Sequence, residues 1–197
     1  MGRQAVHCSG AILGIFAFSL GKAVAGLAAL TVAAILLFLS WWTRKRETVR
    51  RKLPLRVKEL EKVEDEAYEF IESFEREEEL KERPYFGALI FMLAIGLTFL
   101  IFPQGAAILA VLILSISDSA STLVGIHLGT VELPHNPDKS LEGSIAFFLT
   151  ATVIAIFFAA PMGAVLIASL GTLAESLPRI DDNFSVPVTV ALVFLLL

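Results

Sequence analysis

Three short clusters of polar residues interrupt a chain that is otherwise apolar. The first centres on Asp118, within a run of small and hydroxyl side chains at 115–125. The second begins at Lys139, just before an expected helix, and the third is an Asp-Asp-Asn turn at 181–183. Carboxylate and amide oxygens are hard ligands that Mg²⁺ takes together with substrate phosphates. A lysine beside the free N–H groups of a helix N-terminus suits a phosphate.

Each cluster also has a simpler structural interpretation. Asp118 fits a seam of small residues between packed helices, in which its carboxyl is hydrogen-bonded. Ser140 could be a helix N-cap and Lys139 a membrane anchor. The turn at 181–183 could cap a helix, and Glu175 could pair with Arg179 four residues later. The functional interpretation therefore depends on whether the three clusters meet in space.

The composition predicts an all-α integral membrane protein. The 197 residues are 56% hydrophobic and have a mean hydropathy of +0.75. A helix needs about 20 apolar residues to cross the hydrocarbon layer of a bilayer. Runs of that order, bounded by charge, Pro or Gly, predict about seven transmembrane helices. They lie at 6–20, 23–42, 85–102, 106–128, 144–160, 162–177 and 184–197.

Most of the charged residues lie in one window, at 44–83, which we interpret as a cytoplasmic insertion. Its dense Lys and Arg start follows Trp42, and such clusters beside a membrane helix mark the cytoplasmic side. The predicted organisation is 1–43 (two transmembrane helices), 44–84 (insertion) and 85–197 (five helices carrying the motifs). Counting crossings from this anchor places all three polar clusters toward the cytoplasm of a multi-pass cell-membrane protein.

The insertion is predicted to form one long amphipathic helix, because its apolar residues recur three and four positions apart. Its apolar stripe would need a partner, either a second subunit in a homodimer or the protein's own cytoplasmic face. Its basic start would also lie well on the anionic headgroups of membrane lipids. A solvated connector carrying ion pairs is the alternative.

The spacing of the middle clusters resembles a family motif. The polyprenol kinase family comprises CTP-dependent lipid kinases such as dolichol kinase, phytol kinase and the CTP-dependent diacylglycerol kinase, and is related to CDP-diacylglycerol synthase. Its nucleotidyl-binding pattern is D-x-x-A-x-x-x-G-x-x-x-G, eight residues, then K-K-T-x-E-G. In this chain Ser121 replaces the alanine of the pattern, Ser140 replaces its threonine and Asp138 replaces its first lysine. The positions that match in spacing are Asp118, Ser121, Gly125, Gly129, Lys139, Ser140, Glu142 and Gly143.

Two further stretches are similar to the kinases rather than to the synthases. Near the C-terminus a glutamate is followed by the pattern D-D-N-hydrophobic-x-V-P. Near the N-terminus the chain has an Arg-x-x-x-His pattern. The synthases instead end in a longer Lys, Asp, His-Gly-Gly and Asp-Arg signature, which this sequence lacks. The matching residues are Glu175, Asp181, Asp182, Asn183 and Pro187 at one end, and Arg3 and His7 at the other.

The resemblance implies a kinase that transfers phosphate from CTP to the hydroxyl of a membrane lipid alcohol, with a dolichol or polyprenol as the first candidate. Asp118, with Asp181 or Asp182 and with Asn183, would hold Mg²⁺ on the nucleotide. Catalysis would rest on Asp118, Lys139 and Glu142, the last orienting the lysine or the metal's ligands. Arg3, His7 and Glu175 would support the site. The expected nucleotide-binding residues are Ser121, Gly125, Gly129, Lys139, Ser140, Gly143 and Ser144.

Two other functions stay open from the sequence. A CTP-dependent cytidylyltransferase of the phosphatidate type shares the middle motif, but there a lipid phosphate attacks the α-phosphate of CTP. A small transporter or membrane scaffold could instead use Asp118 and Glu175 as ion sites. No nucleic-acid partner is expected.

Overall fold

The structure is a computed structural model that describes residues 2–50, 85–178 and 180–197, with side chains left out at 2–5, 43–44 and 46–50. The predicted insertion helix therefore lies outside the described residues. The helices are α1 (Gly2–Leu20), α2 (Lys22–Arg50), α5 (Phe86–Ile101), α6 (Gln104–Leu112), the π-helix η2 (Ile113–Ser117), α7 (Asp118–Leu128), α8 (Leu141–Ala155), α9 (Pro161–Ser176) and α10 (Asp182–Leu196).

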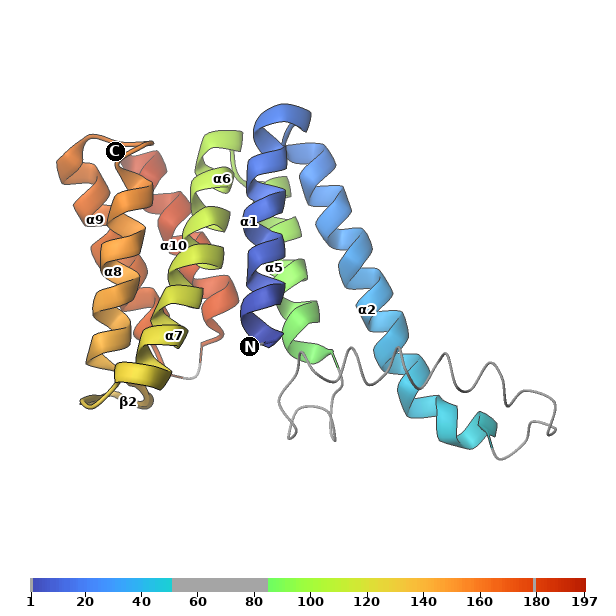
Figure 1. Ribbon diagram of the computed structural model, residues 1–197. Helices are drawn as coiled ribbons and strands as arrows, with labels where there is room; N and C mark the ends of the chain where they lie inside the picture. The colour runs from blue at the N-terminus through green and yellow to red at the C-terminus, as the bar shows by residue number, and fades with distance from the viewer. Residues whose placement is uncertain (1, 51–84, 179) are drawn as a thin grey trace.

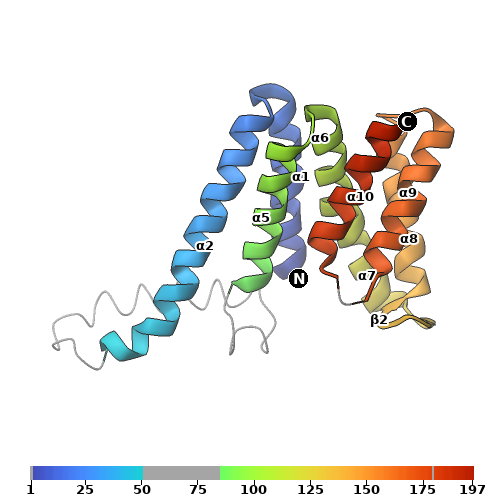
Figure 2. The ribbon, with the colours of Figure 1, turned by 180° about the vertical axis from the view of Figure 1, so that it is seen from behind.

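The helices run up and down between two ends of the molecule (Figure 1). The N-terminus, the β hairpin and the connection from α9 to α10 lie at one end, and the C-terminus lies at the other. Figure 2 shows the same arrangement from behind, with the turns from α1 to α2 and from α5 to α6 at the C-terminal end. Gly21 makes the first of these turns with a φ of 84°, which a glycine adopts without a Cβ clash. Because successive helices alternate in direction, all three polar clusters lie toward one end of the bundle.

The described part of the chain is predominantly helical, as the sequence predicts. Two helical stretches, Lys22–Trp42 (21 residues) and Gln104–Leu128 (25 residues), are long and apolar enough to span a membrane. The other apolar helices are shorter, and a topology of seven spans stays a prediction. The shorter stretches are Val6–Leu20, Phe86–Ile101, Leu141–Ala155, Pro161–Ser176 and Asp182–Leu196.

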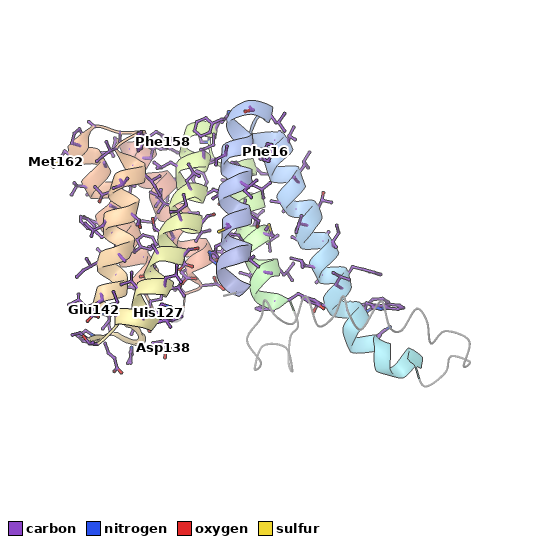
Figure 3. The ribbon with its side chains drawn as sticks, viewed as in Figure 1. Phe16, His127, Asp138, Glu142, Phe158 and Met162 are labelled. Atoms are coloured by element: carbon purple, nitrogen blue, oxygen red, sulfur yellow. The ribbon has the colours of Figure 1, made fainter. Side chains whose placement is uncertain are left out.

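Small residues let the helices approach closely in the core, while large apolar side chains face outward. Residues 106–111 of α6 are fully or almost fully buried, and Phe91, Phe99 and Phe147 fill the space beside them. Large apolar side chains such as Phe157 (83% exposed) and Met162 (82%) point away from the bundle. Figure 3 places Phe16, Phe158 and Met162 at the C-terminal end and His127, Asp138 and Glu142 at the other. This distribution favours a lipid environment around the helices.

Two local features position the polar clusters. The helix that runs from α6 to α7 contains the π-helical turn η2, which ends at Ser117, directly before Asp118. Such turns inside α-helices are often found at functional sites. The loop expected after α7 is a short antiparallel hairpin, with β1 at Glu132–Leu133 and β2 at Asn136–Ser140.

Candidate functional site

A cavity of about 440 Å³ opens at the hairpin end of the bundle. Its walls come from α7, the hairpin, and the adjoining ends of α8, α9 and α10. Asp118 and Gly125 line it from α7, Lys139 from β2, Glu175 from α9 and Asp182 from α10. The three clusters that are separate in sequence therefore share one cavity.

Three carboxylates converge in this cavity, and we call Asp118, Glu175 and Asp182 the carboxylate trio. One oxygen of each lies within 4.8 Å of the others. Asp118 and Glu175 are buried, with 3% and 2% of their surfaces exposed, and Asp182 is half-buried. The trio assembles because Asp118 begins α7, Glu175 lies in the last turn of α9 and Asp182 lies in the first turn of α10.

Lys139 reaches from β2 into the trio. Its Nζ donates to Glu175 Oε1 (2.6 Å), to the Glu175 backbone oxygen (2.7 Å) and to Asp182 Oδ2 (3.0 Å). Burial acts to lower the pKa of Lys139, but the charges and hydrogen bonds of Asp182 and Glu175 together outweigh it, so the pKa lies above its ordinary value of 10.5. The ammonium ion therefore persists throughout the neutral range.

Glu175 is the best-connected member of the trio, yet one of its oxygens has no hydrogen-bond partner. Oε1 accepts from Ser121 Oγ (3.1 Å) as well as from Lys139. Oε2 is buried and has no partner among the described residues. A buried carboxylate oxygen without a donor is costly unless a cation or water meets it. The oxygen-only donor set of the trio suits a hard cation such as Mg²⁺, so the residues present fit the predicted metal.

His7 joins the site from α1. Its Nδ1 lies 3.3 Å from Asp118 Oδ2, and both side chains are 4% exposed. The imidazole packs on Phe91, with ring centroids 4.2 Å apart. His7 thus lies beside the Asp118 carboxylate, and the supporting role expected of it stays a prediction. Arg3 lies one turn earlier on α1, but its side chain is outside the described residues.

The acidic turn before α10 divides into residues with different surroundings. Asp181 is exposed and caps α10, since its Oδ1 accepts from Asn183 N (2.9 Å) and Asn183 Nδ2 (2.8 Å). Asp182 is the residue that joins the trio. Asn183 is buried, and its Oδ1 has no partner among the described residues. Of the two aspartates predicted as metal ligands, Asp182 therefore has the position that suits this role.

Glu142 lies away from Lys139 and contacts the start of the hairpin. Its Oε1 accepts from Thr130 Oγ1 and Thr130 N, and its Oε2 accepts from Val131 N (3.3 Å). These bonds fix the junction between α7 and β1 against the first turn of α8. The expected orientation of the lysine by Glu142 is thus not seen as a direct contact. Its position is that of a residue that shapes the cavity rim.

The first turn of α8 carries the remaining motif residues. Ser140 is its N-cap, because its Oγ accepts from Gly143 N (3.1 Å). Ser144 is buried, and its Oγ has no partner among the described residues. Gly125 and Gly129 of the preceding segment lie against Ser140. The N-terminus of α8 therefore borders the cavity through Ser140 and Gly143, and phosphate binding there stays a prediction.

The hairpin is anchored to the end of α9 by residues that the sequence analysis did not select. Asn136 Nδ2 donates to the Ser176 backbone oxygen (3.2 Å), and His135 Nε2 lies 3.1 Å from Ser176 Oγ. The last carbonyls of a helix lack partners within it, so the bond from Asn136 satisfies a group that α9 leaves open. The anchor holds β2, and with it Lys139, beside Glu175.

Comparisons with known proteins give several partial similarities. The chain is 34% identical over 116 residues to the uncharacterized protein RP860 of Rickettsia prowazekii (strain Madrid E), covering 54% of this chain and 55% of the relative. It is 28% identical over 135 residues to phytol kinase 1, chloroplastic, of Arabidopsis thaliana, covering 59% and 44%. It is 33% identical over 104 residues to probable phytol kinase 3, chloroplastic, of Glycine max, covering 44% and 33%.

The chain thus spans about half or less of the length of these relatives. No family model matches the chain, and no solved structure matches it. The similarity to plant phytol kinases supports a relation to a family of kinases.

Proposed function

We propose that the chain is a CTP-dependent kinase that phosphorylates the hydroxyl of a membrane lipid alcohol. The observation that carries the proposal is the convergence of the carboxylate trio, Lys139 and the α8 N-terminus on one cavity. This convergence joins the segments that match the lipid-kinase motif, and the partial similarity to phytol kinases supports the same class of reaction.

The residues have distinct roles in this proposal. The trio would hold Mg²⁺, which neutralises charge on the transferring phosphate. The N–H groups at the start of α8 and the Lys139 ammonium bind phosphate oxygens. His7 holds Asp118 in place, and Ser121 holds Glu175. Phosphoryl transfer depends mainly on such positioning and on charge stabilisation. These groups would therefore supply the kinds of interaction that the reaction needs.

The proposal also includes the location of the reaction. The apolar helices would cross the cell membrane several times, with the cavity facing the cytoplasm. The surface around the cavity mouth carries apolar side chains such as Ile126 (67% exposed), which would lie against lipid. A lipid alcohol could therefore present its hydroxyl to the cavity while its tail stays in the bilayer. A dolichol or polyprenol and phytol are both primary alcohols that meet this requirement.

Product analysis tests the proposal directly. Purified protein is incubated with Mg²⁺, CTP labelled in either the α- or the γ-phosphate, and either lipid alcohols or lipid phosphates. A kinase moves the γ-label to the lipid and releases CDP. A cytidylyltransferase acts instead on a lipid phosphate, moves the α-label to it and releases pyrophosphate. Absence of CTP binding in the presence of Mg²⁺ would contradict both enzymes and favour a transporter or scaffold.

Variants of the acidic residues connect the activity to the cavity. Asp118→Asn and Asp182→Asn should abolish or nearly abolish transfer, because each removes a charge from the trio. Asp181→Asn is the matched substitution, since asparagine also caps a helix and Asp181 lies outside the trio. It should retain most of the activity. Equal losses in Asp181→Asn and Asp182→Asn would refute the assignment of the metal site to the trio.

A further inference from the structure

The three hydrogen bonds of Lys139 conflict with its proposed contact with phosphate. An ammonium group has three N–H donors, and all three are engaged, two by carboxylate oxygens and one by a backbone oxygen. Lys139 cannot donate to a phosphate without releasing one of these acceptors. The observed arrangement is therefore a state from which Lys139 must move before it meets the nucleotide.

The oxygens that Lys139 occupies belong to the residues that would hold the metal. Glu175 Oε1 and Asp182 Oδ2 come from two of the three members of the trio. A divalent cation and the ammonium group compete for the same carboxylates, and they repel each other at such distances. Occupation of the trio by one cation therefore disfavours the other.

The side chain of Lys139 is suited to such an exchange. It is anchored at its base by β2, while its end is joined to the trio only through Nζ, and 23% of it is exposed. It lines the same cavity as the N-terminus of α8. A change in side-chain rotamer moves the ammonium group within the cavity without any movement of the hairpin, which is held separately by Asn136.

We propose that Lys139 is a built-in counter-ion that occupies the carboxylate trio when no metal is bound, and that metal binding displaces it and frees it to bind phosphate. The exchange imposes an order, in which productive phosphate binding follows metal loading or accompanies it as a metal–nucleotide complex. It also explains how buried carboxylates are held together in the metal-free protein. The proposal rests on the proposed function, because the phosphate is that of the nucleotide.

The first test measures Mn²⁺ binding alone, by electron paramagnetic resonance of free Mn²⁺ with no nucleotide present. Lys139→Met should bind Mn²⁺ at least about ten-fold more tightly than the unaltered protein, because Mn²⁺ no longer has to displace the ammonium group. A ten-fold change in the dissociation constant corresponds to about 1.4 kcal/mol of binding free energy. Lys139→Arg, which retains the charge, should stay close to the unaltered protein. Lys22→Met is the matched control, because Lys22 donates to the Phe102 backbone oxygen at the opposite end.

Equal or weaker Mn²⁺ binding by Lys139→Met would overturn the proposal. Thermal unfolding and size-exclusion chromatography show whether this variant keeps its fold. If it does not, Glu175→Gln supplies a second test, because it removes one of the two negative charges that hold Lys139 without removing the lysine. Without metal, in EDTA, Glu175→Gln should bind CTP several-fold more tightly than the unaltered protein. With Mg²⁺ it should bind CTP more weakly.

The two proposals fail in different ways. If the protein transfers the γ-phosphate of CTP but the Lys139 and Glu175 variants show neither shift, the counter-ion role is wrong and the function stands. If CTP binds equally well with Mg²⁺ and in EDTA, metal loading does not free Lys139, and the proposed order is wrong. If neither transfer nor CTP binding is found, the proposed function itself is refuted.

Discussion

The glycines of the motif permit a test of the site that does not alter any charged group. A Cβ built at Gly129 would lie 2.3 Å from the Gly125 backbone oxygen and 2.8 Å from Ser140 Oγ. At Gly143 the nearest atom would be the Ser121 backbone oxygen, at 3.0 Å, and at Gly125 it would be Ser140 Oγ, at 3.3 Å. The space available for a methyl group thus decreases from Gly125 through Gly143 to Gly129.

These distances predict an order of effects for substitution by alanine. Gly129→Ala must displace backbone, which in a packed site costs about 1–3 kcal/mol. Gly143→Ala requires a shift of a few tenths of an ångström between α7 and α8, and Gly125→Ala only a small movement of a serine hydroxyl. We expect losses of stability and transfer activity to follow Gly129, then Gly143, then Gly125. Gly129 has a φ of −65°, so the effect arises from space and not from backbone conformation.

The assay is thermal unfolding in detergent, together with transfer of the γ-phosphate at saturating and limiting CTP. Gly171→Ala serves as the matched control within a helix, because its Cβ would meet only side chains, those of Val190 at 3.3 Å and Phe147 at 3.6 Å, away from the cavity lining. If Gly129→Ala were as stable and as active as Gly125→Ala, the close approach of α7, the hairpin and α8 would be refuted.

Two more predictions concern the hairpin and its lysine. Asn136→Ala removes the bond to the Ser176 backbone oxygen and should lower the free energy of unfolding by about 1 kcal/mol, measured by thermal unfolding. Because the hairpin carries Lys139, the substitution should also raise the KM for CTP. An unchanged KM would contradict the anchoring role. The pKa of Lys139 is raised in the folded protein, so its pairing with Asp182 and Glu175 stabilises the fold fully below pH 10.5 and less as the pH rises beyond it. Unfolding measured from pH 8 to 11 should show this loss in the unaltered protein and a smaller one in Lys139→Met, and identical profiles would contradict it.

Hydrophobic length and charge are enough to predict where the helices lie, but some ends differ: α8 is Leu141–Ala155, against the predicted 144–160. Apolar runs bounded by Gly, Pro or charged residues coincide with the apolar helices found in the described part of the chain. The polar clusters were predicted to share one end because alternate connections of an up-and-down bundle must do so. At that end a cavity reaches Asp118, which lines it although only 3% of its surface is exposed.

The details within the site depend on side-chain geometry that spacing does not encode. Asp181 and Asp182 are adjacent in the sequence, and only the N-cap geometry of α10 directs one to the helix backbone and the other to the trio. In the kinase interpretation Glu175 was expected only to support the site. A signal for it exists, because it is a lone carboxylate in the apolar run 162–177, and ionisable groups in such runs are candidates for function.

The hairpin anchor shows a different limit of sequence reasoning. Asn136 and His135 lie in a polar loop where neither periodicity nor motif distinguishes them from solvent-facing residues. Their partners belong to Ser176, 40 and 41 residues further along the chain. The Asn136 bond is possible because the end of α9 leaves carbonyl groups without partners, and His135 adds a contact with the Ser176 hydroxyl. Only the packing of the hairpin against that end reveals it.

The balance of charge connects these observations. The trio brings three carboxylates together, and Lys139 is the cation that the structure pairs with two of them. Glu175 Oε2 remains without a partner even with Lys139 in place, so the lysine does not satisfy the acceptors of the trio completely. Buried carboxylates in this number require further positive charge, a proton or water to be stable. A divalent cation provides more charge than Lys139 at the same oxygens, and in the proposed exchange this difference would turn the ion pair into a phosphate-binding lysine. If the same carboxylates serve both cations, the lysine charge that balances the trio without metal is also the charge that metal binding would make available to the nucleotide.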